Sequence, residues 1–162
     1  MAQSDVRPLI ETSFKRWLTA AFASLAEFTP PDGKGAFTIY AGRRQAQLDA
    51  PCLVASCESA EETEGPGTGL FRAPLNLVLM TSIDEDEPDS ADWAAAEATH
   101  RERLNFLTNR MQGADALAAL AANLSDGSLQ VFAVIPKATL SDEPLPQILT
   151  DVLSFEIVCQ AL

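Results

Sequence analysis

The stretch that decides the fold is LFRAPLNLVLMTSI, residues 70–83, in which apolar side chains recur at every second position. A period of two predicts a β-strand with one face against a core. The other face carries Arg72, Pro74 and Asn76. Because proline lacks a backbone N–H donor, we expect this half of the strand to lie at a sheet edge or beside a bulge. The predicted inward-facing residues are Phe71, Ala73, Leu75, Leu77 and Leu79.

Four more segments favour strands. Residues 36–42 form a short one, and residues 51–57 are apolar on both sides, which is typical of a strand inside a sheet. Residues 128–136 and 148–160 could pair as a hairpin across a wide loop, residues 137–147. The last strand is expected to point Leu149, Leu153, Phe155, Ile157 and Cys159 inward.

Three segments have helical periodicity. Residues 5–28 place apolar side chains three and four apart, with Asp5 or Ser4 as the cap and TPPDGKG as the stop. Residues 90–111 form a second helix, on which Glu97 precedes Arg101 by four positions and can pair with it. ADALAALAANL, residues 114–124, forms a third. The apolar stripe of the second helix contains Trp93, Ala96, His100, Leu104, Leu107 and Met111.

The order of these elements is a helix, three strands, two helices and two strands. Strands that come in runs, apart from the helices, favour the α+β class. We therefore predict a mixed, mainly antiparallel sheet of about five strands. It packs against an N-terminal helix and a central helix pair, in one domain of residues 1–162.

Composition narrows the range of functions. The chain has 23 acidic and 11 basic residues, a net charge of −12, so a module that grips nucleic-acid phosphates is disfavoured. No apolar run has the roughly 18–20 residues that a membrane span requires, and the first residues do not resemble a secretion signal. The three cysteines are too few for a disulfide scaffold, and a reducing compartment is the simpler assumption.

The candidate reactive groups are Cys52, Cys57, Cys159 and the only histidine, His100. A spacing of five on a strand puts Cys52 and Cys57 on opposite faces, so we expect two buried thiols and neither a zinc site nor a disulfide. Any Cys–His chemistry would depend on His100, whose place on an apolar stripe favours a hydrogen-bonded core residue. We therefore expect no catalytic residues and no cofactor.

Acidic loops are the other prominent feature. ESAEETE and DEDEPD lack the alternation of a calcium loop, so solvated loops are expected, with a weak divalent-ion site as the alternative. Long loops on a small scaffold usually bind partners, which suggests an assembly subunit. The candidate interface residues are Arg43, Arg44, Glu58, Glu61, Glu62, Asp84, Glu85, Asp86, Glu87, Asp142 and Glu143.

The chain resembles a known family in the order of its elements and in short phrases. These are IYAGRRQAQLDAPCLVASCESAEE, then HRERLNFL, DALAALAANL, LQVFAVIP and LSFEIVCQ. Most of the chain is similar in this way to the small tail-terminator and tail-completion proteins of tailed bacteriophages. The sequence departs from a simple member of that family in the insert DEDEPDSADW and in the loop KATLSDEPLPQ.

The resemblance implies a ring, typically a hexamer, at the head-proximal end of the phage tail tube. Such a ring ends tube polymerisation and joins the tail to the head connector or adaptor, in a virion assembled in the host cytoplasm. DNA passes through its centre without specific binding, and no membrane is involved. The alternatives are a tail-tube or minor-tail subunit, a head–tail adaptor, and a small-molecule-binding or Cys/His enzyme domain that uses Cys57 and His100.

Overall fold

The alternating segment forms β4 (Leu70–Ser82), the middle strand of a six-stranded sheet. The computed structural model describes residues 5–22, 38–42, 52–63, 67–82, 91–141 and 148–162. The sheet order is β1-β2-β4-β6-β5, and the two-residue strand β3 also pairs with β4. Among the described strand pairs, only β1–β2 is parallel. The remaining strands are β1 (Thr38–Ala41), β2 (Cys52–Ser56), β3 (Glu61–Glu62), β5 (Leu129–Ser141) and β6 (Ile148–Ala161).

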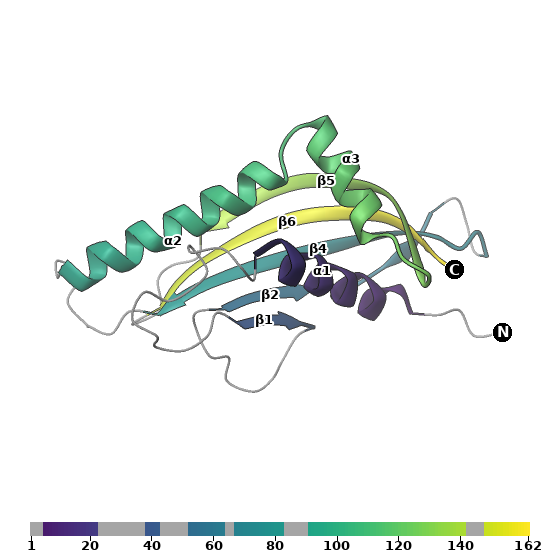
Figure 1. Ribbon diagram of the computed structural model, residues 1–162. Coiled ribbons are helices and arrows are strands. Elements are labelled where there is room, and N and C mark those ends of the chain that lie inside the picture. Colours follow the sequence, from purple (N-terminus) through teal and green to yellow (C-terminus); the bar gives the residue numbers. More distant parts are fainter. Residues whose placement is uncertain (1–4, 23–37, 43–51, 64–66, 83–90, 142–147) are drawn as a thin grey trace.

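The three described helices, α1 (Val6–Phe22), α2 (Ala91–Arg110) and α3 (Ala114–Leu124), lie on one face of this sheet (Figure 1). The expected inward residues of β4 form the floor of the core, because Ala73, Leu75, Leu77 and Leu79 are fully buried. Side chains from α1, α2 and α3 pack on them in one hydrophobic cluster. The predicted α+β class is therefore confirmed.

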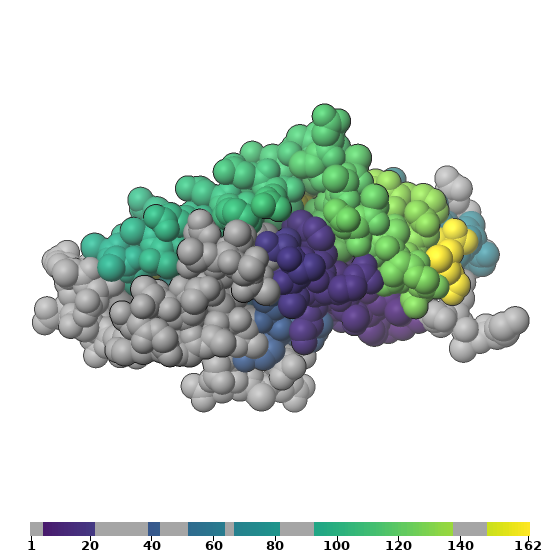
Figure 2. Space-filling view, viewed as in Figure 1, coloured from purple at the N-terminus to yellow at the C-terminus, as the bar shows by residue number. Residues whose placement is uncertain are grey.

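Helix α1 begins at the predicted cap, since Asp5 Oδ1 accepts a hydrogen bond from the backbone N–H of Arg7 at 3.1 Å. Helices α1 and α3 lie beside each other on the surface (Figure 2). Their contact is reinforced by Arg16, which donates to Asp126 Oδ2 at 2.6 Å. The same carboxylate accepts from the backbone N–H groups of Ser128 and Leu129, so one aspartate closes the turn into β5 and ties it to α1.

The predicted hairpin is present as the antiparallel β5–β6 pair. However, the prediction of a loop over residues 137–147 is wrong for residues 137–141, which continue β5. The register shifts between Pro136 and Ala138, and this bulge lets the strand resume after the proline. The predicted acidic loop ESAEETE is likewise not all loop, because Glu61 and Glu62 form β3 opposite Arg72 and Phe71.

Pro74 occupies a gap in the sheet. It pairs with Glu156 of β6 on one side. On the other side, β2 ends opposite Asn76, and β3 begins only opposite Arg72. A missing N–H donor is tolerated in such a gap, in agreement with the expected local edge.

Among the described helices, none has both the length and the hydropathy of a membrane-crossing segment.

Candidate functional site

Two polar constellations stand out, and the first is buried between α2 and the sheet. His100 of α2 is 4% exposed, and its ring lies between Thr81 of β4 and Asp151 of β6. Its Nδ1 is 2.7 Å from Thr81 Oγ1, and its Nε2 is 2.6 Å from Asp151 Oδ2. Because a carboxylate accepts hydrogen bonds, we assign a proton to Nε2, which donates to Asp151, and Nδ1 shares the second hydrogen bond with the Thr81 hydroxyl.

The prediction that His100 is a hydrogen-bonded core residue is confirmed. Its neighbour on the same helix face, Arg103, is also buried, and loss of hydration lowers the pKa of its guanidinium. Thr81, His100 and Asp151 contain the residue types of a hydrolytic triad. All three are buried, however, and none lines the three surface clefts described below. The two hydrogen bonds of His100 link α2 to β4 and β6.

Cys57 lies far from this histidine. The thiol follows β2, which ends opposite Asn76, whereas His100 contacts Thr81, five residues farther along β4. At about 3.4 Å per residue this separation is about 17 Å. A Cys57–His100 pair is therefore not formed. Cys52 and Cys57 lie on opposite faces as predicted, with Cys52 Sγ 3.8 Å from Met80 Sδ and Cys57 within the helix-covered core.

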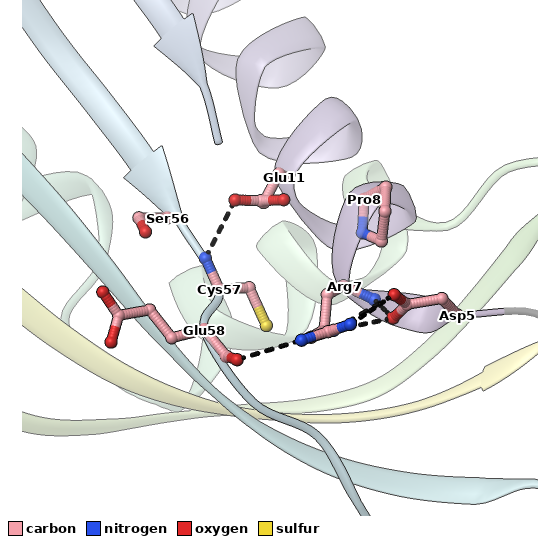
Figure 3. Close-up of a pocket in the computed structure, with 7 residues that line it drawn as sticks. All are labelled: Asp5, Arg7, Pro8, Glu11, Ser56, Cys57 and Glu58. Carbon is pink, nitrogen blue, oxygen red and sulfur yellow. Dashed lines mark hydrogen bonds and ion pairs between the residues drawn. The ribbon is translucent and has the colours of Figure 1, made fainter. Parts of the chain in front are cut away.

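The second constellation is exposed, where α1 begins beside the end of β2 (Figure 3). Arg7 bridges two segments: its Nη2 is 2.6 Å from Asp5 Oδ2, and its Nη1 donates to the backbone carbonyl of Glu58 at 3.2 Å. The hydrogen bonds from Arg7 hold the pKa of the Asp5 carboxyl below its usual range, and Asp5 in turn raises the pKa of the guanidinium. Arg7 thus fixes the start of the acidic segment, residues 58–62, against α1.

One helical turn farther on, Glu11 forms a second link between α1 and the end of β2. Its Oε2 accepts from the backbone N–H of Cys57 at 3.1 Å. Partial burial raises the pKa of Glu11, although this hydrogen bond opposes the shift. Burial, and then the negative charge of Glu11, raises the pKa of the Cys57 thiol to about 12. Cys57 is thus a neutral thiol at physiological pH, unsuited to nucleophilic attack.

Two shallow clefts flank the Arg7–Glu58 bridge, with volumes of about 450 and 380 Å³. Asp5, Arg7 and Glu58 line both. The larger cleft adds Pro8, Glu11, Ser56 and Cys57, and the smaller adds Val6, Ser59, Ala60 and Phe71. Together these surfaces form a polar corner on the helix-covered side of the sheet, which we call the α1–β2 corner. A third cleft, of about 270 Å³, lies at the β5 edge and is lined by Thr108, Met111, Gln112, Pro136, Lys137, Leu153, Ser154 and Phe155.

Three of the predicted interface residues lie in the described part of the chain. Glu58 and Glu61 are exposed, and Glu62 is half-buried, with Oε2 accepting from the backbone N–H of Gly67 at 2.7 Å. Of these three, Glu58 contacts Arg7 through its backbone carbonyl, whereas Glu61 and Glu62 pair with β4 in β3. The other predicted interface residues lie outside the described residues: Arg43, Arg44, Asp84, Glu85, Asp86, Glu87, Asp142 and Glu143.

Sequence reasoning missed Arg7, Glu11 and Asp151. Asp151 had a usable signal, because it shares the odd-numbered, inward-facing positions of β6 with Leu153 and Phe155. An acid at such a position needs a buried partner, and a histidine on an apolar helical stripe needs one too. Arg7 and Glu11 had no comparable signal, because the contacts that tie them to the end of β2 are to backbone groups of the distant residues Glu58 and Cys57.

Within the described ranges, no three His, Cys, Asp or Glu side chains are grouped so that they could hold a metal ion. No protein-family model matches the sequence, and no curated protein matches it either. The function must therefore be inferred from the fold and from the α1–β2 corner.

Proposed function

We propose that this protein is a structural subunit of a phage tail. Copies of it form a closed ring, expected to be a hexamer, that ends the tail tube on the head side. The ring binds the tube protein on one side and the head connector or adaptor on the other, and DNA passes through its centre. The subunit carries out no reaction.

The observation that carries this proposal is the arrangement of the elements. An N-terminal helix and a central helix pair cover one face of a mixed, mainly antiparallel sheet. This is a small α+β domain, the fold class that the resemblance to tail-terminator proteins implies. A ring needs two different patches on each subunit, because a rotational contact joins unlike surfaces. The two edges of this sheet, β1 and β5, differ in length, partners and surroundings.

The chemistry of the described side chains is consistent with a structural role. His100 is held by two buried hydrogen bonds, and all three thiols are buried. The net charge of −12 favours a channel past which DNA can slide without adhering. Screening at physiological salt limits that repulsion to about 8 Å from the wall.

The proposal is tested by purifying the protein and measuring its mass by size-exclusion chromatography with light scattering, followed by negative-stain imaging. A closed ring of one defined mass is expected. Tubes of variable length would indicate a tail-tube subunit, and a protein that stays monomeric with the tube protein present would contradict the proposal.

A genetic test addresses termination itself. Where the gene lies beside tail-tube and portal genes, its deletion should produce tails of unregulated length that do not attach to heads. Expression of the protein in trans should restore uniform, joined tails. Tails of normal length in the deletion strain would contradict a role in termination.

A further inference from the structure

The turn between α3 and β5 contains Asp126 followed by Gly127, a pair of residues that can react with each other. The backbone nitrogen of the second residue attacks the side-chain carboxyl carbon of the aspartate and closes a five-membered succinimide ring. Glycine permits this attack most readily, because it has no side chain to hinder the approach. The sequence contains one other such pair, Asp32–Gly33, which lies outside the described residues.

The reaction needs no reagent other than water. In the first step a bond forms between the nitrogen of Gly127 and Cγ of Asp126, and the amide hydrogen leaves with the carboxyl hydroxyl as one water molecule. In the second step one water molecule opens the ring. Opening at the former main-chain carbonyl gives isoaspartate, in which the chain runs through the side-chain carboxyl group and the free carboxylate is attached to Cα. The product has the same mass as the original chain.

The turn holds the Asp126 carboxylate away from this reaction through its first oxygen. Oδ1 accepts hydrogen bonds from the backbone N–H groups of Ser128 and Leu129, at 2.7 and 2.9 Å. These bonds direct the carboxyl group past Gly127 to the two residues that follow. The backbone N–H of Asp126 also donates to the carbonyl of Leu129 at 2.8 Å, so the main chain of the turn is fixed as well.

The second oxygen is held by helix α1, more than 100 residues earlier in the chain. Oδ2 accepts from Nη1 of Arg16 at 2.6 Å and from the buried hydroxyl of Ser13 at 3.3 Å. The other guanidinium nitrogen of Arg16 donates to the carbonyl of Asn123 at 2.9 Å, at the end of α3. The backbone N–H of Ser128 and then the contact with Arg16 hold the pKa of Asp126 below its usual range. The neutral carboxyl group, which is the form that can lose its hydroxyl, is therefore scarce while α1 is docked.

We propose that Asp126 is a site of spontaneous isoaspartate formation that the docked helix α1 keeps closed. The reaction proceeds in chains in which α1 has left the turn, because Oδ2 is then free and the carboxyl group can rotate back toward the nitrogen of Gly127. Isoaspartate cannot restore the lost contacts, because its main chain is one carbon longer and its carboxylate is attached one carbon closer to that main chain. A chain that reacts therefore loses the tie between α1 and the turn permanently. This inference is independent of the proposed function.

Peptide mapping by mass spectrometry, with an isoaspartyl methyltransferase to label the product, measures the reaction in the full chain. The protein is aged at pH 7 in buffer and in urea above its unfolding transition. In urea, Asp126 and Asp32 should isomerise at comparable rates, because both are then in unfolded chain. In buffer, isomerisation of Asp126 should be at least about tenfold slower than in urea, because it requires local opening of the turn.

Variants of α1 test the role of the docked helix. Arg16→Leu removes the ion pair and should raise the rate at Asp126 in buffer about fivefold, through a larger population of the open turn. Ser13→Ala removes only the hydroxyl and should produce a smaller rise. Lys15→Leu removes a neighbouring exposed charge from the same helix and should leave the rate unchanged. Circular dichroism verifies that each variant is folded, and Ser13→Ala decides where Arg16→Leu does not fold.

Gly127→Ala is the control for the chemistry. The space around a Cβ atom at this position is open, and the backbone is not in the left-handed region, so the fold should be unchanged. The added methyl group hinders the attacking nitrogen and should slow isomerisation of Asp126 in urea. Equal rates at Asp126 in buffer and in urea would overturn the proposal. A folded Arg16→Leu or Ser13→Ala variant that isomerises no faster than the unmodified protein in buffer would do so too.

Discussion

The most informative perturbation of the fold is His100→Leu. This change replaces the imidazole with an apolar side chain of similar volume, so it leaves little cavity. It removes the 2.6 Å hydrogen bond to Asp151 and the 2.7 Å hydrogen bond to Thr81. A hydrogen bond to a charged group contributes about 1.5–3 kcal/mol and a neutral one about 0.5–1.5 kcal/mol. We therefore expect the free energy of unfolding to fall by about 2–4 kcal/mol.

Comparison variants separate the two hydrogen bonds. Thr81→Val keeps the shape of the side chain and loses only the bond to Nδ1, so it should cost about 1 kcal/mol. The double variant His100→Leu/Asp151→Leu removes the buried carboxylate together with its partner. The single variant is costly because it leaves the Asp151 carboxylate buried without His100. The double variant should therefore be more stable than His100→Leu alone.

Urea unfolding followed by circular dichroism, at one fixed protein concentration, measures these differences. With a slope of about 1–3 kcal/mol per molar urea, a loss of that size shifts the midpoint by about 1–2 M. The reasoning would be refuted if His100→Leu cost no more than Thr81→Val, or if the double variant were less stable than His100→Leu.

Three further predictions concern Asp126, Cys57 and Glu11. The backbone N–H of Ser128 and the guanidinium of Arg16 hold the pKa of Asp126 below its usual range. This carboxylate therefore stabilises the fold above about pH 4 and loses that effect as the pH falls through its folded pKa. Asp126→Asn should lower the urea midpoint at pH 7 and have less effect at pH 3. Because the pKa of the Cys57 thiol is raised to about 12, this thiol should react with Ellman's reagent at pH 8 only in urea. Rapid labelling of the folded protein would contradict its burial. Cys57→Ala should assemble normally. Glu11→Gln keeps an acceptor for the backbone N–H of Cys57 and avoids the cost of partly burying a charge. The melting temperature of this variant at pH 7 should therefore equal or exceed that of the unmodified protein. Glu11→Leu removes the acceptor and should lower the melting temperature.

The sheet was predictable because its strands follow simple periodic patterns. Alternation in β4 and β6 identifies the core-facing residues directly, and the continuous apolar run of β2 correctly places it inside the sheet. The continuation of β5 beyond Pro136 was not predictable, because a proline in a sequence normally signals the end of a strand. Pairing with β6, which is 14 residues long, keeps β5 extended, and a bulge accommodates the proline.

The candidate site was harder to predict, for a physical reason. Glu58 and Glu61 could be identified because runs of acids must be solvated. The position of Glu58 depends on Arg7, which is 51 residues away and binds a backbone carbonyl that any residue could supply. Strand β3 was missed because two adjacent glutamates have low strand propensity, and their pairing with β4 is set by the tertiary structure.

The two polar constellations hold different helices at opposite ends of the sheet. Apolar packing alone allows helices to slide over a sheet, because hydrophobic burial is not directional. The bonds of His100 fix α2 at the end where β4 and β6 carry Thr81 and Asp151, and the bonds of Arg7 and Glu11 fix α1 at the end of β2. In the ring proposed above, each subunit would need this rigidity, because an angular error at each contact accumulates around a ring and prevents its closure. Loosening either constellation should therefore broaden the range of assembled masses before it unfolds the protein.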